Sequence, residues 1–453
     1  MRKHQKYSLI IKMKPLKGLL FFSLILLLSN SCKQKTATEY SPIVNNPDFY
    51  HGCINRLTDV IIHDIFSPPV ASRIYSYATL AGYEAMVSGD KNYASMVGKI
   101  KDFNKVSQPE AGKEYCYPLS GIKAFMTVAR GLTFSVEKYD DFEKDLDKKF
   151  KDAGVPSDVI ERSVAYGDSV GKSILAYAKK DKYPQTRGLR YTLQNKPGTW
   201  QPTPPSYADA IEPNWGTIRS MAIDSSTQFM PPAPFPYDMA KTSPFMKEVT
   251  EIYEMGKNLT EEQKRIAWFW DDNAFVMNVQ GHVMFADKKM TPGGHWLAIV
   301  KTVCKDKKVD LMKSAQAYLL VSMALRDAFI NCWEVKYRYH KIRPETIINA
   351  SVDTKWIPFL QTPPFPEYTS GHSTISGASA EVLTQLFGEN VAFTDSTEAK
   401  FGHGVGQFKS FNEAAAQASI SRCYGGIHFT SACDEGLKTG KKIGEWVMLK
   451  TKK

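Results

Sequence analysis

The chain has 453 residues, of which 43% are hydrophobic and 12% aromatic, and it carries a formal net charge of +11. This hydrophobic content is enough for a large core and excludes a disordered protein. Residues 1–31 hold six lysines and arginines and no acidic residue, so their removal would lower the net charge to +5. A charge this small on a chain of this length does not indicate a nucleic-acid-binding protein.

The first 31 residues have the layout of a bacterial export signal. A basic opening precedes an apolar run over residues 18–28, which is too short for a comfortable membrane-spanning helix. The run ends in Ser29-Asn30-Ser31-Cys32, which resembles a loose lipobox. We therefore predict a signal peptide over 1–31 and acylation of Cys32. The protein would be an exported lipoprotein, held to a membrane by its lipid alone on the periplasmic or cell-surface side. Simple cleavage and an uncleaved anchor are the alternatives.

Helical patterns dominate beyond a polar tether at residues 33–46. Apolar and small residues recur at helical spacing in six segments, which are 67–89, 115–134, 159–180, 243–256, 260–272 and 310–342. Between Tyr183 and Pro236 lies a stretch with many prolines and two tryptophans. We predict an ordered long loop there, because its aromatic side chains need something to pack against.

Alternating β patterns with hairpin turns are nearly absent, so we predict an all-α protein. We divide it into an N-terminal helical part, 47–235, and a C-terminal helical part, 236–453, within one continuous domain. Six cysteines remain beyond Cys32, at positions 53, 116, 304, 332, 423 and 433. Their spacing matches no CxxC or zinc-type pattern and indicates no pairing.

The helix predicted over 310–342 ends in the sequence KYRYHKIRP. Lys336 and Arg343 are seven residues apart, or two helical turns, so their side chains should point to nearly the same side. Pro344 disfavours helix at the residue before it, so the guanidinium should reach out from the helix end. A solvated basic face is the alternative, because three further basic residues lie in the same run, Arg338, His340 and Lys341.

A second motif is EYTSGHST at residues 367–374, followed by the helix-like sequence ISGASAEVLTQLF. One interpretation is that Ser370 caps this helix and His372 is a surface residue of its first turn. The other is that the turn leaves backbone N–H groups free to face an anion, with His372 aimed at it.

The third motif lies in FNEAAAQASISRCYGGIHFTSACDEG, where an alanine-rich helix should stop at Gly425-Gly426. Arg422 falls in the last turn and His428 just past the glycines. Alone, the pair is explained by an arginine that favours the helix macrodipole and a histidine at the edge of the core.

The order and spacing of the three motifs resemble the signature of the vanadium haloperoxidase and type 2 phosphatidic acid phosphatase superfamily: Lys-x6-Arg-Pro, then Ser-Gly-His, then Ser-Arg-x5-His. The sequence PPFPEYTSGHST is similar to the bacterial chloroperoxidase-like branch in particular. Phe365 stands where chloroperoxidase-like relatives carry an aromatic residue and bromoperoxidase-like ones a histidine. The motifs cover Lys336 to His428, and FWDDNAF and TPGGHWL further upstream are compatible with the bacterial relatives. The resemblance implies the helical bundle of this haloperoxidase and acid phosphatase type.

The resemblance also implies a site for vanadate, whose oxygens carry delocalised negative charge that fixed donors and bidentate arginines can hold. It assigns the oxyanion contacts to Lys336, Arg343, Ser370, Gly371 and Arg422. His428 would be the axial ligand of vanadium, and His372 would be the acid–base residue on the opposite side. Lys336 would in addition polarise hydrogen peroxide.

The chain departs from the family pattern at two positions. Thr369 replaces the usual proline before Ser-Gly-His, which the turn should tolerate. Ala432 replaces the aspartate that commonly lies four residues after the ligand histidine and orients its imidazole. Asp434 or a backbone carbonyl could serve instead.

Three functions follow from the resemblance. The leading one is a vanadate-dependent haloperoxidase, which oxidises a halide with hydrogen peroxide to a hypohalous acid equivalent that halogenates an organic acceptor. The second is a soluble acid phosphatase that works through a phosphohistidine at His428, for which the missing aspartate is the more serious loss. The third is a non-catalytic oxyanion-binding lipoprotein, which Ala432 would favour.

Overall fold

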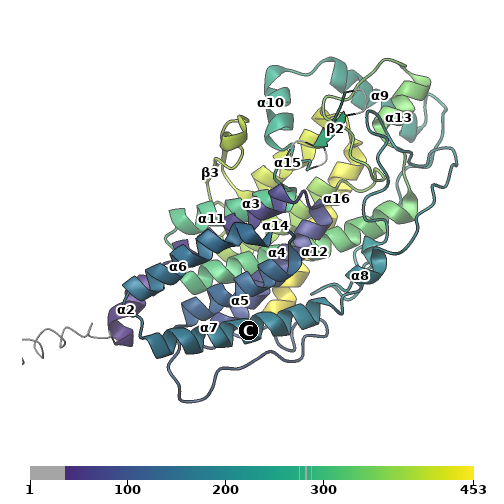
Figure 1. Ribbon diagram of the computed structural model, residues 1–453. Coiled ribbons are helices and arrows are strands. Elements are labelled where there is room, and N and C mark those ends of the chain that lie inside the picture. Colours follow the sequence, from purple (N-terminus) through teal and green to yellow (C-terminus); the bar gives the residue numbers. More distant parts are fainter. Residues whose placement is uncertain (1–35, 275, 281–282, 287, 453) are drawn as a thin grey trace, which may run out of the picture.

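The computed structural model describes residues 36–274, 276–280, 283–286 and 288–452 (Figure 1). The described chain is mostly helical, which confirms the all-α prediction. The predicted signal peptide and Cys32 lie outside the described residues. Among the described helices, none is both long and apolar enough to cross a membrane.

The helices in chain order are α2 (Ala37–Val44), α3 (Asp48–His63), α4 (Pro68–Val87), α5 (Tyr117–Leu132), α6 (Asp140–Asp152), α7 (Ser157–Ala178), α8 (Tyr183–Thr186), α9 (Pro244–Lys257), α10 (Glu261–Phe269), α11 (Pro292–Asp306), α12 (Leu311–Tyr339), α13 (Pro344–Ser351), α14 (Gly371–Phe387), α15 (Phe411–Tyr424) and α16 (Thr430–Thr451). Short 3-10 turns are η1 (Val136–Tyr139), η2 (Trp215–Thr217) and η3 (Ala399–Phe401). Two antiparallel pairs of short strands complete the fold, β1 (Met277–Gln280) with β2 (Val283–Ala286) and β3 (Phe393–Asp395) with β4 (Gly406–Phe408).

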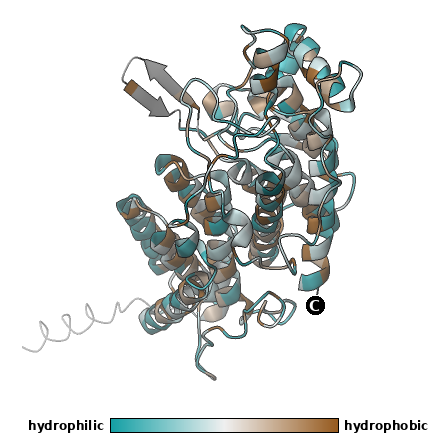
Figure 2. Ribbon diagram, turned by 90° about the vertical axis from the view of Figure 1, so that its right-hand side faces the viewer, coloured by the Kyte–Doolittle hydropathy of each residue, from teal (hydrophilic) through white to brown (hydrophobic). Residues whose placement is uncertain are grey.

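The long helix α12 is the centre of the molecule and packs against α4, α11, α14 and α16. Figure 1 shows these helices in the middle, with α5, α6 and α7 toward one end and α9, α10 and α13 toward the other. Helix α4 is buried along its whole length. One hydrophobic cluster extends from Tyr40 to Val447, so the predicted N-terminal and C-terminal parts share a core. Hydrophilic residues lie mainly on the outer faces of the peripheral helices (Figure 2).

Helices α14 and α16 approach each other closely enough to fix the start of α14. A Cβ atom at Gly440 would lie 2.0 Å from the carbonyl oxygen of Thr374, so at this crossing the side chain has to be absent. At the same end, the backbone N–H of Ser370 donates to the carbonyl of Ala432 at 3.0 Å. These contacts hold the Ser-Gly-His turn against the first turn of α16.

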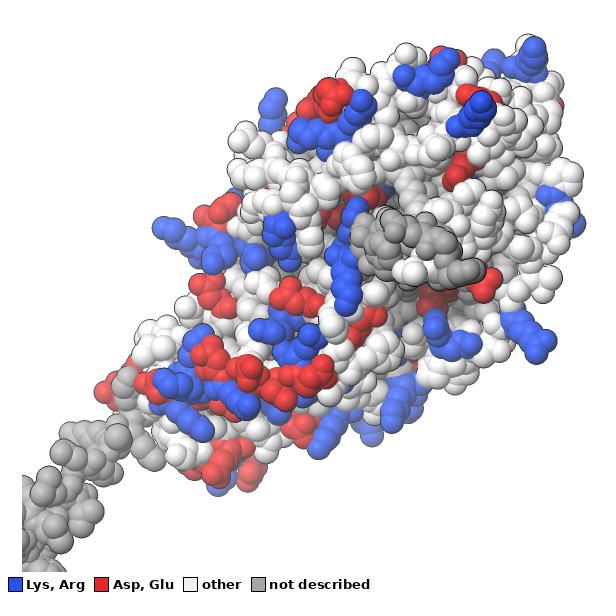
Figure 3. All heavy atoms as spheres, turned by 45° about the horizontal axis from the view of Figure 1, so that its top comes forward, with Lys and Arg blue, Asp and Glu red and all other residues white. Residues whose placement is uncertain are grey.

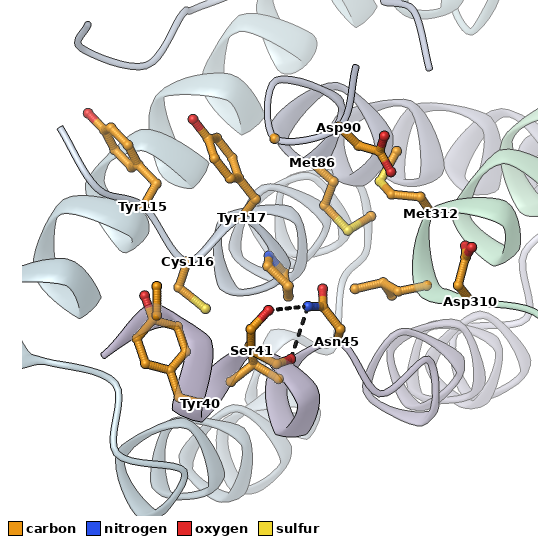
Figure 4. A pocket seen from close by; sticks show the side chains of 15 residues that line it. Tyr40, Ser41, Asn45, Met86, Asp90, Tyr115, Cys116, Tyr117, Asp310 and Met312 are labelled. Carbon is orange, nitrogen blue, oxygen red and sulfur yellow. Dashed lines mark hydrogen bonds between the residues drawn. The ribbon is translucent and has the colours of Figure 1, made fainter. Parts of the chain in front are cut away.

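Helix α2 lies inside the segment that we predicted to be a polar tether, so that prediction is wrong for residues 37–44. Thr36 and Glu39 form a capping box at its start, and Tyr40 and Val44 are buried. The Tyr40 hydroxyl donates to Glu114 at 2.5 Å. A pocket of about 390 Å³ lies between α2 and the helices beside it, with Tyr40 and Tyr117 among its walls (Figure 4).

Helix α12 ends at Tyr339, three residues before the predicted end at 342. His340 takes a left-handed conformation with φ of 49°, and the following residues pair with the long loop: the N–H of Ile342 donates to the carbonyl of Gly198 at 2.9 Å. Lys336 and Arg343 therefore do not share a helical face. The long loop is ordered as predicted, because Trp200 and Trp215 are buried.

The charged side chains are mixed in sign on the face shown in Figure 3. Lysines and arginines stand beside aspartates and glutamates, and several are ion pairs one turn apart on a helix, such as Lys148 with Asp152. Exposed pairs of this kind contribute little to stability, about 0–1 kcal/mol each.

Candidate active site

The three motifs meet at one buried hollow beneath the ends of α12, α14 and α15. Four of the predicted site residues line it directly, Gly371, His372, Arg422 and His428. Its remaining wall is largely apolar and includes Phe329, Trp333 and Phe365. The pocket of Figure 4 is larger, about 390 Å³ against about 30 Å³, but charged motif side chains converge only on the smaller one of these two. We call this smaller cavity the site hollow.

Ser370 and His372 combine both interpretations of the second motif. The Ser370 hydroxyl caps α14 by accepting from the N–H of Ser373, yet the helix start faces the site hollow through Gly371. His372 is half-buried, and its Nε2 is fully buried without a hydrogen-bond partner. Its other ring nitrogen therefore makes the bond to the backbone of Trp270. Burial, and next the charge of Arg422, hold the pKa of His372 well below its usual value.

Lys336 is completely buried, and its ammonium group forms hydrogen bonds with the backbone of the second motif and of the residue just before it. It donates to the carbonyls of Pro366, Glu367 and Thr369 at 2.8, 2.9 and 2.5 Å. These bonds account for all three hydrogens of an ammonium group. Burial, with a contribution from Arg343, lowers the pKa of Lys336 to about 7, while the three carbonyls favour the charged form.

Arg343 is the N-cap residue of α13 and lies outside the helix, as the Pro344 argument predicted, and its side chain is buried. Its Nε donates to the carbonyl of Phe365 at 2.9 Å, and its Nη1 donates to that of Ile427 at 2.7 Å. The same Nη1 lies 3.1 Å from Nε2 of His428. The remaining nitrogen, Nη2, is buried and has no partner.

His428 is oriented by Glu367, a residue that the sequence interpretation missed. Nδ1 of His428 lies 2.9 Å from Oε1 of Glu367, and the N–H of Phe429 donates to the same oxygen at 3.1 Å. Asp434, the substitute considered from sequence, is exposed. The bond to Glu367 places the ring hydrogen on Nδ1, so Nε2 carries the lone pair on the other side, where Nη1 of Arg343 lies 3.1 Å away. The sequence feature that could have identified Glu367 is the presence of an acidic residue inside PPFPEYTSGHST.

Arg422 closes the opposite wall of the site hollow. Its Nε donates to the Ser421 hydroxyl at 2.9 Å, and its Nη2 donates to the carbonyls of Ala267 and Trp270 at 3.3 and 2.6 Å. Nη1 is buried without a partner. The carbonyl of Trp270 thus accepts from Arg422 as well as from His372.

The site has an excess of buried positive charge. Lys336, Arg343 and Arg422 are each at most 1% exposed, and none of them hydrogen-bonds a carboxylate of the described residues, since the Glu367 carboxylate bonds His428 and Phe429 instead. Burial lowers the pKa of both arginines, to about 10 for Arg343, which leaves them cationic at neutral pH. Buried charges require partners. The unpartnered Nη atoms of the two arginines and the unpartnered Nε2 of His372 therefore define a site for an anion, beside the Nε2 of His428 that Arg343 contacts.

Comparison with known proteins identifies the class to which this fold and site belong. The family described as the VCPO second helical-bundle domain matches residues 316–453. The crystal structure of the first bacterial vanadium-dependent iodoperoxidase is 42% identical, covers 89% of this chain and 96% of its own, and has a TM-score of 0.83. The chain belongs to the bacterial vanadium-dependent haloperoxidases, and the predicted family and bundle are confirmed.

More distant structures share the fold. Holo and apo structures of a bacterial vanadium-dependent chloroperoxidase are both 16% identical to this chain, with TM-scores of 0.67 and 0.65. The holo structure covers 92% of this chain and 96% of its own, and the apo structure covers 85% and 95%. No curated protein sequence matches the chain.

Proposed function

We propose that this protein is a vanadate-dependent haloperoxidase that uses hydrogen peroxide to oxidise a halide to a hypohalous acid equivalent for an organic acceptor. The observation that carries the proposal is the set of buried atoms without partners, Nη1 of Arg422 and Nε2 of His372 on the site hollow and Nη2 of Arg343 beside His428. Membership of the haloperoxidase family supports the same activity.

The residues present fit vanadate. The guanidinium groups of Arg343 and Arg422 would offer fixed donors to the oxygens of vanadate, and the start of α14 would add the N–H of Gly371 and the positive end of a helix dipole. Nε2 of His428, whose ring Glu367 orients, would hold the vanadium. Bound vanadate would supply a Lewis-acid centre that activates hydrogen peroxide toward halide without changing its oxidation state.

The protein's own groups control protons and water. The low pKa of His372 keeps its imidazole neutral at neutral pH, and its bond to Trp270 leaves Nε2 free to accept a proton from a molecule in the site hollow. The rings of Phe329, Trp333 and Phe365 exclude water from that side. Lys336 holds the carbonyls of the second motif in place. To polarise hydrogen peroxide as well, its ammonium group would have to exchange one of its hydrogen bonds to these carbonyls for a bond to the peroxide.

We propose iodide as the halide oxidised most readily, supported by the 42% identity to an iodoperoxidase. Of the two alternatives from sequence, the non-catalytic protein loses its main support, because Glu367 supplies the carboxylate that Ala432 lacks. Because Glu367 takes the place of the missing aspartate, the chief objection to a phosphatase is also removed. The test therefore measures both halide oxidation and phosphomonoester hydrolysis.

The experiment is an activity comparison on the purified mature chain loaded with orthovanadate. Oxidation of iodide, bromide and chloride is measured with hydrogen peroxide, beside hydrolysis of a phosphomonoester by the vanadate-free protein. We expect vanadate-dependent iodide oxidation and negligible hydrolysis. Hydrolysis that vanadate inhibits, without halide oxidation, would contradict the proposal and favour the phosphatase.

We also propose that the protein is exported and anchored through lipid on Cys32, which rests on the sequence of residues 1–32. Metabolic labelling with a radioactive fatty acid tests it: label should enter the wild-type chain and be lost in Cys32→Ser. Equal labelling of the two chains would refute acylation at this cysteine.

A further inference from the structure

A second cluster of ionisable side chains lies behind Trp270. Asp272 follows α10, His295 belongs to the first turn of α11, Asp395 ends β3, and Glu398 directly precedes η3. Their exposed fractions are 1%, 0%, 0% and 3%. Three segments of the chain thus bring three acids and one histidine together with almost no exposure to solvent.

His295 lies between two aspartates. Its Nδ1 is 3.1 Å from both carboxylate oxygens of Asp272, and its Nε2 is 2.7 Å from Oδ2 of Asp395. Ligand atoms of Asp272, His295 and Glu398 all lie within 4.8 Å of one another. The three residues could therefore hold one metal ion together.

Glu398 provides the independent sign that a ligand is missing. Its Oε1 is buried and has no hydrogen-bond partner. The ammonium group of Lys289 already bonds Asp271 at 2.6 Å, so it is engaged elsewhere. A protonated His295 would satisfy the two aspartates and leave Glu398 without a partner, whereas a divalent cation between Asp272, His295 and Glu398 would satisfy all of them.

We propose that Asp272, His295 and Glu398 bind one divalent metal ion of the zinc type. One imidazole and two carboxylates are common zinc ligands, and three protein ligands leave a fourth position for water. Asp395 would accept the hydrogen of the non-ligating ring nitrogen, the contact that usually orients a metal-bound histidine. This site adjoins the vanadate site, because Asp272 also lines the site hollow, and its ion would be structural.

The position of this cluster gives the ion a defined effect on the active site. The indole of Trp270 stacks on the His295 ring, with centroids 4.6 Å apart and planes inclined by 19°. The carbonyl of the same Trp270 accepts hydrogen bonds from Arg422 and His372. An ion that fixes His295 and Asp272 would therefore also fix the carbonyl that holds two active-site side chains.

Zinc binding to the vanadate-free, tag-free mature chain tests the proposal. After chelation and removal of the chelator, we expect the protein to bind one equivalent of Zn²⁺ by calorimetry and its melting temperature to rise with Zn²⁺. Glu398→Gln, which keeps the size of the side chain, should remain folded but lose this binding and this rise. Asp395→Asn should weaken binding by about 10–100-fold.

The control is Glu389→Gln, which changes an exposed glutamate between α14 and β3 and should bind Zn²⁺ like the wild type. Two outcomes would overturn the proposal. One is a wild-type chain whose melting temperature and calorimetric trace do not respond to Zn²⁺, which would leave His295 as a proton-carrying partner of the two aspartates. The other is undiminished binding by Glu398→Gln, which would place the ion elsewhere.

Discussion

At the residue scale, Glu367 supplies the carboxylate that orients His428, although the chain lacks the usual aspartate for this role. The usual aspartate is replaced by Ala432, and the orienting carboxylate comes from another segment, 61 residues upstream of His428. Sequence spacing could not reveal this exchange, because it depends on how the second motif folds over the third. The residue types of the site were predictable from the motifs, but this partner was not.

Replacing Glu367 by glutamine tests its orienting role. The substitution keeps the size of the side chain and removes its charge, so we expect vanadate affinity to fall by about 10–100-fold in a folded protein, as for other partners of metal-ligating histidines. Asp434→Asn is the matched control and should bind vanadate like the wild type, because Asp434 is exposed. If Asp434→Asn bound vanadate more weakly than Glu367→Gln, the orienting role would belong to Asp434.

Lys336 makes anion affinity depend on pH. Its pKa is lowered to about 7, and a bound anion favours the ammonium form, so binding takes up a proton above that pH. Affinity for tungstate, an oxyanion whose own charge is constant there, should fall by up to about tenfold per pH unit above 7. Lys336→Met should flatten the profile. A profile in the wild type as flat as in the variant would show that Lys336 stays charged throughout.

Phe365 is both a packing residue and a wall of the site hollow. Its ring is 8% exposed, and its centroid lies 5.0 Å from that of Trp333 and 5.0 Å from Nζ of Lys336. Phe365→His should leave vanadate bound and shift the ratio of chloride to bromide oxidation, because an imidazole would donate a hydrogen bond where an apolar ring now excludes water. If the rates of chloride and bromide oxidation change in parallel, or do not change, Phe365 is only a packing residue and does not determine halide selectivity.

At the element scale, the sequence predicted the long helices well and their connections poorly. Long runs of apolar and small residues identify helices such as α4 and α12, because a sequence of this kind and length suits a buried helix better than a strand. The early end of α12 depends instead on pairing with the long loop at Gly198. Helix α2 was missed because it is short, and its two buried side chains are a weak pattern.

The crossing of α14 and α16 supports a prediction about stability. Gly440→Ala would place a methyl group against backbone atoms that cannot move aside, so the free energy of unfolding should fall by about 3 kcal/mol, the upper part of the usual range for overpacking. Gly293→Ala is the matched control in α11, since the nearest atom to its new Cβ would be Cδ1 of Leu325 at 3.6 Å, an ordinary contact. Urea unfolding measures both variants. Equal stabilities would mean that the two helices can separate without loss.

At the scale of the whole molecule, the fold converts distant segments into one anion site. The bundle brings together α12, the segment before α14, the start of α14 and the loop between α15 and α16, and it removes their charged side chains from water. This convergence explains why each motif alone had an ordinary explanation. The buried donors without partners become evident only when the segments are assembled.

The most direct test of the central claim is vanadium content, measured by elemental analysis after gel filtration in orthovanadate-free buffer. The wild type should retain one vanadium per chain, and His428→Ala should retain none, because His428 is the residue assigned to hold the vanadium. His372→Ala should retain vanadium while iodide oxidation falls by about 10²–10⁴-fold, the usual size of an acid–base contribution. Undiminished vanadium in His428→Ala, or equal loss of vanadium in both variants, would contradict the assigned site.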